Sequence, residues 1–392
     1  MKLTIDAISL ASILGNLKLG DAIIIKNKKT DKKEDLVNVV LSAQNNRLRI
    51  QLITFDSVLT SYNSAAKCWD AGCDKYTITV EIEAHIIEEG AYSLTLAQAK
   101  KIAKVCTRGD AELLTSGASL EVTQGQKKTR IAIESAEHVS FPDVCDGILV
   151  PKSAIFEVIG STSVPDDTLN CLHQWVAVQS SPRGTSVSWT DGAQMFWHRC
   201  DLDIASKRML IPVFALECLK ALKPADEVVE VKPDGVRCGN ACVEYLEQTP
   251  DYPSTIEIIT GMNTNRYSHV KTTCEDVRSM LKQLSSCMDD LVVMSASNGR
   301  LRMLSYNDKH GKCKDWQSCP RAETWTDAET EGGFTGVGLH APRLKRALGK
   351  YTGPVTFHIE DSYSPVFIDI ENSGIKTALM PRTPTFSKTS ID

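Results

Sequence analysis

Residues Met294–Asp308 read MSASNGRLRMLSYND, two alternating apolar and polar stretches that are separated by a polar turn and followed by an acid. Alternation with a period of two is typical of a strand, and two such strands around a polar turn indicate a β-hairpin. The same order occurs in LSAQNNRLRIQLITFD (Leu41–Asp56) and in VQSSPRGTSVSWTDG (Val178–Gly192). The sequence therefore predicts one β-hairpin repeated three times.

A candidate helix follows each hairpin at a similar distance. The stretches SLTLAQAKKIAKVC, MLIPVFALECLKALK and GVGLHAPRLKRALGK begin at Ser93, Met209 and Gly336. Each has apolar residues three and four positions apart, with lysine or arginine between them, as expected of a helix with one buried face. A second candidate helix precedes each hairpin, in TIDAISLASILGNLK, KSAIFEVIGS and TCEDVRSMLKQLSS.

More alternating strands follow the later helix of each repeat, so the repeating unit has two helices and about eight strands in roughly 130 residues, a normal domain size. Turn-rich segments near Gly147 and Asn265 mark the boundaries. The predicted domains are residues 1–147, 148–265 and 266–392. Helices that cover one face of such sheets define an α+β protein.

Composition limits the possible functions of the 392 residues. Apolar residues make up 42% and charged residues 24%, as in ordinary folded proteins, and a length of this kind favours two or three domains. The net charge of −5 argues against a protein coated in positive charge but leaves room for a local basic surface. No apolar run approaches a membrane span, and Asp6 interrupts the segment MKLTIDAISL where a signal peptide would be apolar, so we expect a cytoplasmic protein.

Thirteen cysteines are an odd number, and their spacings do not repeat as CxxC pairs, which makes a disulfide framework unexpected. The tightest metal-like cluster is His310, Cys313 and Cys319, three potential zinc ligands without a fourth. Scattered reduced thiols are the simpler interpretation. No cofactor is predicted.

Lysine and arginine recur on all six candidate helices, whereas acids concentrate in strands and loops. Such residues are good helix formers and solvate exposed faces, which explains each helix taken alone. Because the pattern recurs in three repeats, we favour a shared basic lining that binds the phosphates of a polyanion without reading sequence. The candidate DNA-facing residues are Lys18, Lys100, Lys101, Lys104, Arg108, Lys152, Lys220, Lys223, Arg278, Lys282, Arg343, Lys345, Arg346 and Lys350.

Several short motifs resemble the bacterial replicative sliding clamp, the β subunit of DNA polymerase III, over nearly the whole chain. The stretch WTDGAQMF matches that family's TDG turn, MLIPVFALECLKAL its VIP-like strand, and TPDYPST its PDY segment. DSYSPVFI matches a D-x-x-SP-V motif, and ALMPRTP matches the terminal M-P-x-R motif in part. Each motif is short, so the order and spacing of the set carry the resemblance.

The resemblance implies a head-to-tail ring of two identical subunits around double-stranded DNA. It also implies an apolar pocket between the second and third domains, into which the polymerase, the clamp loader and repair proteins insert short linear motifs. A closed ring leaves no unpaired end, which suits head-to-tail assembly, and a flexible methionine suits varied peptides. The implied pocket residues are Leu172, Thr190, Gly192, Met195, Pro250, Thr255, Pro365, Met380 and Pro381.

The chain departs from the family's pattern at three places. Ala193 and Gln194 stand where the family usually has His-Arg, so a polar edge of the pocket is missing. Arg382 follows Pro381 directly, and the chain continues as TPTFSKTSID, for which a disordered tail is the default expectation. The loop Lys26–Leu36 is strongly charged, which predicts a solvated loop or a contact with DNA or the loader.

By position, the family's subunit contact would fall on an edge strand with Ile131 and Ile133 and on a helix with Leu281 and Leu284. Pairing such an edge in a dimer is sensible, because an unpaired apolar edge invites aggregation.

Two other functions are compatible with parts of the sequence. An enzyme could use His198 with Asp191 or Cys200, with Glu88 and Glu89 as further acids, but no Gly-rich phosphate loop, HExxH helix or GxSxG elbow is present. A clamp-fold scaffold that recruits partners without encircling DNA is the second alternative.

Overall fold

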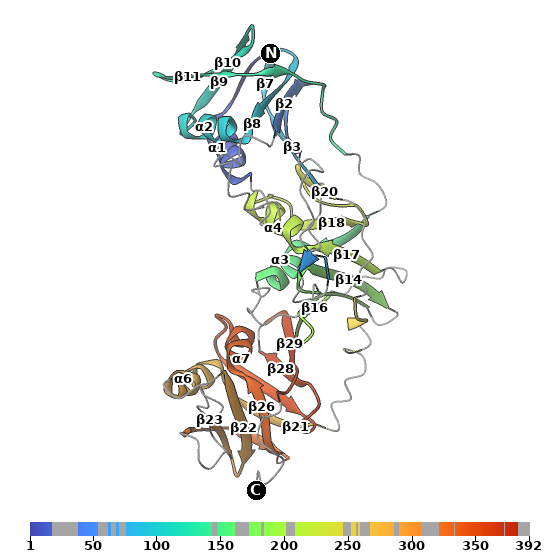
Figure 1. The fold of residues 1–392 in the computed structure, drawn as a ribbon, viewed down its shortest axis with the longest axis vertical. Helices are drawn as coiled ribbons and strands as arrows, with labels where there is room; N and C mark the ends of the chain where they lie inside the picture. Colours follow the sequence, from blue (N-terminus) through green and yellow to red (C-terminus); the bar gives the residue numbers. More distant parts are fainter. Residues whose placement is uncertain are drawn as a thin grey trace. The chain divides into compact units, whose positions relative to one another are not determined.

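The computed structural model describes residues 1–17, 38–53, 62–63, 68–69, 76–142, 147–160, 172–181, 184–200, 208–245, 252–255, 258, 267–285, 290–306, 321–332, 334–371 and 373–382 (Figure 1). They form two compact units. The first comprises Met1–Phe156, Leu169–Val176 and Met209–Asp251, and the second comprises Glu157–Thr168, Ala177–Arg208 and Tyr252–Asp392. The three-domain boundaries near Gly147 and Asn265 stay a prediction from the repeats.

The first unit contains two antiparallel sheets with strand orders β11-β10-β9-β1-β7 and β12-β8-β2-β3-β6-β20-β19-β18-β13. A further short pair joins β4 to β5. The elements are β1 (Lys2–Asp6), α1 (Ala7–Asn16), β2 (Asn38–Gln44), β3 (Arg47–Ile53), β4 (Tyr62–Asn63), β5 (Cys68–Trp69), β6 (Tyr76–Glu83), β7 (His85–Glu88), β8 (Gly90–Thr95), α2 (Leu96–Val105), β9 (Asp110–Ser116), β10 (Ser119–Gln124), β11 (Lys127–Ala132), β12 (Glu134–Ser135), β13 (Ile148–Pro151), the start of α3 (Lys152–Gly160), η3 (Leu172–Gln174), most of β17 (Arg208–Pro212), α4 (Val213–Ala221), β18 (Val228–Lys232), β19 (Gly235–Cys238) and β20 (Ala241–Tyr245).

Helices α1 and α2 lie side by side (Figure 1), and local capping fixes where each begins. The Asp6 carboxylate accepts a hydrogen bond from the Ser9 backbone N–H at 2.7 Å. Hydrogen bonding to the side chain of Ser9, and then to its backbone, lowers the pKa of Asp6. Thr95 and Gln98 form a capping box at the start of α2. Helix α1 buries Leu10, Ile13 and Leu14 but leaves Ile8 58% exposed, and α2 buries Leu96, Ala99 and Ile102.

The second unit contains two antiparallel sheets with strand orders β14-β15-β16-β29-β28-β27-β21-β25 and β24-β23-β22-β26. Helices α6 and α7 pack side by side and bury Leu284 and Leu344 in one core with β22, β26 and β27. The elements are most of β14 (Trp175–Ser181), β15 (Gly184–Thr190), β16 (Gln194–Cys200), β21 (Ser268–Thr273), α6 (Cys274–Leu284), β22 (Leu291–Ser297), β23 (Arg300–Tyr306), β24 (Arg321–Asp327), β25 (Glu329–Glu331), β26 (Phe334–His340), α7 (Ala341–Leu348), β27 (Pro354–Ile359), β28 (Val366–Ile370) and β29 (Ile375–Leu379).

The predicted hairpins and helices are present. Strands β2–β3, β14–β15 and β22–β23 are hydrogen-bonded neighbours, and each of the six predicted helices forms. The turns Asn45–Asn46 and Asn298–Gly299 have positive φ at both residues, a conformation that asparagine and glycine adopt more readily than other residues. The α+β prediction is confirmed.

The predicted subunit-contact side chains need correction. In the single chain Ile131 and Ile133 are each 5% exposed, and Leu281 and Leu284 are 4% and 1% exposed. Leu281 and Leu284 belong to the core of the second unit. These four side chains are already removed from water, so they offer no apolar surface to another subunit. The edge position of β11 itself is as predicted.

Candidate functional site

The turn Thr190–Gln194 between β15 and β16, hereafter the 190–194 turn, is closed by its own side chains. The Thr190 hydroxyl donates to the Gln194 carbonyl at 2.8 Å and accepts from the Gly192 N–H at 3.0 Å. Asp191 Oδ1 accepts from the N–H groups of Ala193 and Gln194 at 2.9 and 2.7 Å. Gly192 has φ +86°, a value that favours glycine. The TDG sequence thus specifies a rigid local turn.

The C-terminal segment Met380–Arg382, hereafter the strap, is held at both ends. The Met380 N–H donates to the Ala193 carbonyl of the 190–194 turn at 2.9 Å, and the Arg382 N–H donates to the Gly338 carbonyl of β26 at 2.8 Å. The Met380 side chain remains 47% exposed, although β29 just before it is buried. The strap therefore presents an apolar side chain at the surface from a fixed backbone.

The strap backbone passes close to Gly338, where the absence of a side chain leaves room for it. A Cβ atom at this position would collide with the Arg382 carbonyl oxygen. We expect Gly338→Ala to lower the free energy of unfolding by about 1–3 kcal/mol, since backbone must move to relieve the overlap. Chemical denaturation measures this, with Gly15→Ala in α1 as the control. Gly15 has no atom within 4 Å of its Cβ position, so that change is expected to be neutral or stabilising. Equal stability of both variants would contradict the prediction.

A buried ion pair ties the 190–194 turn to α7. Arg343 donates from Nε and Nη2 to Asp191 Oδ2 at 3.3 and 3.2 Å, and the Asp191 side chain has no exposed area. Gln194 is 1% exposed and donates from Nε2 to the Arg343 carbonyl at 3.2 Å. Its Oε1 accepts from Arg346 Nη1, also at 3.2 Å. Gln194 stands where the family that the sequence resembles has an arginine. Both its amide nitrogen and its amide oxygen form hydrogen bonds with α7.

This pairing corrects one predicted DNA-facing residue. Arg343 is 9% exposed, and its guanidinium is held by Asp191, so it is unavailable to a phosphate. The cause is a partner 152 positions away in the chain.

Some of the predicted pocket residues are exposed or half-buried, and others are buried. Gly192 and Met380 are exposed, and Pro365 and Pro381 are half-buried. Pro365 precedes Val366, which pairs with Leu379 in β29, so the register places Pro365 beside Met380.

Thr190, Met195 and Thr255 are buried. Met195 packs with Trp197, Phe367 and Ala378. The Thr255 hydroxyl bonds to Gln179 Oε1 and to the Ser188 hydroxyl, each at 2.7 Å.

Two predicted pocket members lie outside the described part of the second unit. Leu172 lies in the first unit, and Pro250 lies outside the described residues. Their place in the pocket stays a prediction.

Tyr363, at 66% exposure, is an apolar surface residue that the sequence analysis missed. Asp361 Oδ1 accepts from the N–H groups of Tyr363 and Ser364 at 2.7 and 2.5 Å, and these bonds lower the pKa of Asp361. Such an Asx turn could be read from the D-S-Y-S sequence. It presents Tyr363 just before Pro365.

The predicted DNA-facing cations are unevenly available. On α2, Lys101 and Lys104 are exposed, as is Arg108 just beyond it, and the helix contains no acid. On α7, Lys345 is exposed, as is Lys350 just beyond it, and this helix too contains no acid.

Several other predicted cations are engaged within the chain. Lys152 pairs with Glu227 at 3.1 Å, Lys220 donates to the Phe156 carbonyl at 3.4 Å, and Arg278 donates to the Gly349 and Tyr351 carbonyls at 3.0 and 2.7 Å. Lys100 is half-buried, Lys223 and Lys282 are exposed, and Lys18 lies outside the described residues, as does the charged loop Lys26–Leu36. The strongest acid-free basic faces are therefore those of α2 and α7.

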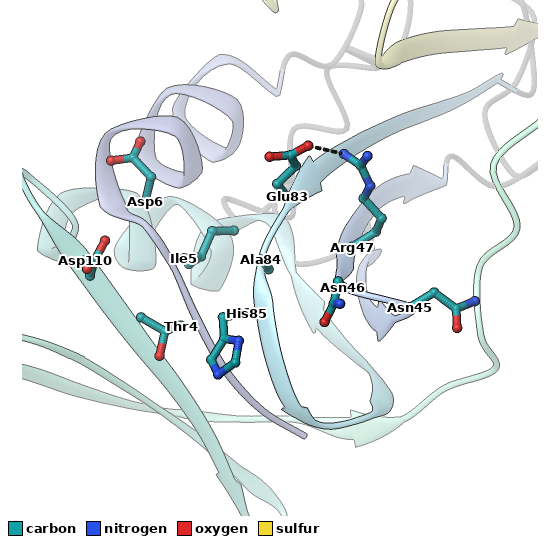
Figure 2. Close-up of a pocket in the computed structure, with 10 residues that line it drawn as sticks. All are labelled: Thr4, Ile5, Asp6, Asn45, Asn46, Arg47, Glu83, Ala84, His85 and Asp110. Atoms are coloured by element: carbon teal, nitrogen blue, oxygen red, sulfur yellow. Dashed lines mark ion pairs between the residues drawn. The ribbon is translucent and has the colours of Figure 1, made fainter.

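A separate cleft of about 630 Å³ opens in the first unit beside β1 and the β2–β3 turn (Figure 2). Asp6, Glu83 and Asp110 contribute carboxylates to its wall, and Arg47 pairs with Glu83 at 3.2 Å. Asp6 serves as the cap of α1. None of these residues belongs to the predicted sites.

The side chains of the alternative catalytic pairings are buried or engaged with other groups of the chain. The Asp191 carboxylate is bonded to its own turn and to Arg343. Cys200 is 4% exposed, and its Sγ lies 3.9 Å from His198 Nδ1, while His198 Nε2 lies 3.8 Å from Glu157. Glu89 accepts from the Asn45 N–H, and the neighbouring Glu88 lies in β7.

Six cysteines whose side chains the structure describes are core thiols. Cys106, Cys200, Cys218, Cys238, Cys242 and Cys274 are all reduced and buried. Burial raises the pKa of Cys106 to about 11 and that of Cys242 to about 12, so both stay protonated at neutral pH.

The cluster His310, Cys313 and Cys319 lies outside the described residues. Within the described ranges, no group of three metal-ligating side chains comes together. No helix in that part of the chain is long and apolar enough to cross a membrane.

The fold is that of solved bacterial sliding clamps. The DNA polymerase sliding clamp of Pseudomonas aeruginosa aligns with a TM-score of 0.73 at 15% identity, covering 98% of this chain and 100% of that one. The β subunit of DNA polymerase III from Thermotoga maritima has a TM-score of 0.72 at 13% identity, covering 98% and 99%. The Caulobacter crescentus sliding clamp has a TM-score of 0.70 at 17% identity, covering 98% and 100%.

No protein-family model matches the chain, and no curated protein matches it in sequence. The structural likeness extends over 98% of the chain, and it confirms the sliding-clamp fold predicted from the repeats and motifs.

Proposed function

We propose that this chain is a DNA sliding clamp, a processivity factor that encircles duplex DNA and tethers a replicative polymerase. The observation that carries the proposal is an end-to-end likeness to sliding clamps, with alignment of 98% of this chain and 100% of the Pseudomonas aeruginosa clamp. The contact between the 190–194 turn and the strap supports it, because it brings together exposed Met380 and Gly192, two residues of the pocket that the resemblance implies.

The proposed mechanism is topological. Once two subunits close around DNA, release requires opening an interface rather than breaking a phosphate contact. Weak phosphate contacts from α2 and α7 then permit sliding. The pocket meanwhile raises the effective concentration of the polymerase at the primer end. The clamp itself performs no chemistry and uses no cofactor in this proposal, and ATP is used by a separate loader.

The proposed homodimer would join unpaired sheet edges. Strand β11 ends one sheet of the first unit, and β24 ends one sheet of the second. Trp325 on β24 is 60% exposed, so a large aromatic side chain is left in contact with water at the edge of a sheet. Head-to-tail pairing of β11 with β24 of a second copy would satisfy both edges and cover Trp325, and twofold symmetry would close the ring.

Replacing Trp325 by glutamate is expected to weaken the dimer at least about tenfold, because a charge would be buried at the proposed interface. Sedimentation velocity across a concentration series measures the change. Tyr363→Glu is the matched control, since Tyr363 is exposed to a similar degree away from either edge. A dimer unaffected by Trp325→Glu would contradict the proposed interface.

The deciding test of the function is retention on DNA. After loading by the cognate loader, a dimer is expected to remain on circular duplex DNA and to leave when the circle is cut. Solution mass is measured on the same sample. A monomer that is indifferent to DNA topology would instead favour the recruitment scaffold without encirclement.

A further inference from the structure

Three segments of the second unit form a closed set of contacts. The 190–194 turn contacts α7 through Asp191 and Gln194, and it contacts the strap through the Ala193 carbonyl. The strap contacts β26, directly before α7, through the Gly338 carbonyl. Two chains of contacts therefore connect α7 to the strap, one of which runs through the side chain of Gln194.

Gln194 is the residue of this set that depends most on α7 for its hydrogen bonds. It is 1% exposed, and α7 supplies the partners for both its amide nitrogen and its amide oxygen. A buried amide oxygen that loses its donor is costly, so Gln194 must move if Arg346 leaves. Its backbone lies one residue from Ala193, whose carbonyl holds Met380.

Arg346 is also the member of the set that a polyanion can reach. It is half-buried, next to exposed Lys345 and close in sequence to exposed Lys350, on a helix without acids. Its bond to Gln194 is a 3.2 Å contact with a neutral amide oxygen. A phosphate binds guanidinium as a charged, bidentate partner and forms shorter and stronger hydrogen bonds than an amide does.

We propose that Arg346 couples DNA contact to the peptide pocket: a backbone phosphate at α7 withdraws the guanidinium from Gln194 and loosens the turn that holds Met380. The proposal rests on the proposed function, because it requires α7 to meet DNA. Coupling of this kind is reciprocal, so a peptide that stabilises the strap favours the Arg346–Gln194 bond and weakens phosphate binding by the same factor.

Hydrogen–deuterium exchange of the fragment Ile375–Arg382, which contains the bonded N–H groups of Met380 and Arg382, tests the coupling directly. The probe is a short mixed-sequence DNA duplex at low salt, with binding followed by anisotropy of the labelled duplex. In the native protein, the duplex is expected to speed exchange of this fragment about threefold or more. Arg346→Gln is expected to exchange faster without DNA and to be insensitive to the duplex.

Lys345→Gln is the matched control. It removes one positive charge from the adjacent position, yet Lys345 has no role in the Gln194 contacts, so its exchange should still respond to the duplex. Duplex binding without a change in strap exchange would overturn the coupling and leave the clamp function standing. An Arg346→Gln response equal to that of the native protein would also overturn it. Absence of duplex binding would overturn the coupling, whereas the clamp function is decided separately by retention on circular DNA.

Discussion

Replacing Lys101, Lys104, Lys345 and Lys350 by glutamine is expected to weaken equilibrium binding of linear duplex DNA and to flatten the dependence of that affinity on salt. These four lysines are exposed on or directly after α2 and α7, the two acid-free basic helices. Each phosphate contact releases condensed counterions, and its loss lowers the slope of log affinity against log salt by about 0.9. If all four contact phosphate, the slope falls by roughly 3 to 4 for each subunit.

The control variant loses the same number of positive charges, but from lysines that lie on strands. Lys2, Lys232, Lys271 and Lys376 lie in β1, β18, β21 and β29, and their replacement by glutamine changes the net charge equally. We expect the control to retain most of the native salt slope. The proposed DNA-facing role of α2 and α7 fails if both variants lose the same affinity for linear duplex DNA, because net charge alone would then explain the effect.

The second large effect is expected at the strap. Replacing Met380 and Pro381 by alanine should weaken polymerase binding by about thirtyfold or more, the cost of losing a central apolar anchor. Met380 is 47% exposed on a backbone held at 2.9 Å to Ala193, so the native side chain is already placed for a partner. Surface plasmon resonance with the cognate polymerase measures the loss.

The strap variant is expected to leave the ring intact, since neither residue lies on β11 or β24. Sedimentation should therefore give the native dimer mass. Leu149→Ala is the matched control, because Leu149 is 59% exposed and belongs to the first unit, whereas the strap belongs to the second. Polymerase affinity that survives the loss of both strap side chains would show that partners bind elsewhere.

The fold was predictable because its signals are local. Alternation with a period of two defines β22 and β23, and an Asn-Gly pair supplies the positive φ values of the turn between them. Three- and four-residue spacing of apolar positions defines α2 and α7, and a capping box starts α2 within four residues. Backbone geometry and side-chain period act over a few positions, so a single sequence records them. Met380 was implied as a pocket residue by the family resemblance and not by this local pattern, and the structure leaves its side chain 47% exposed.

The sequence by itself determined the repeated elements, the fold class and which residues share a face of a helix or strand. Only the tertiary structure decided which faces remain available. Arg343 and Lys345 are both basic residues of α7, but Arg343 forms a buried ion pair with Asp191, which lies 152 positions earlier in the chain. Ile131 and Leu281 were expected at an interface, yet the chain's own core covers them. The spacing of apolar and charged residues specifies that a face needs a partner, and only packing between distant segments determines whether that partner comes from the same chain.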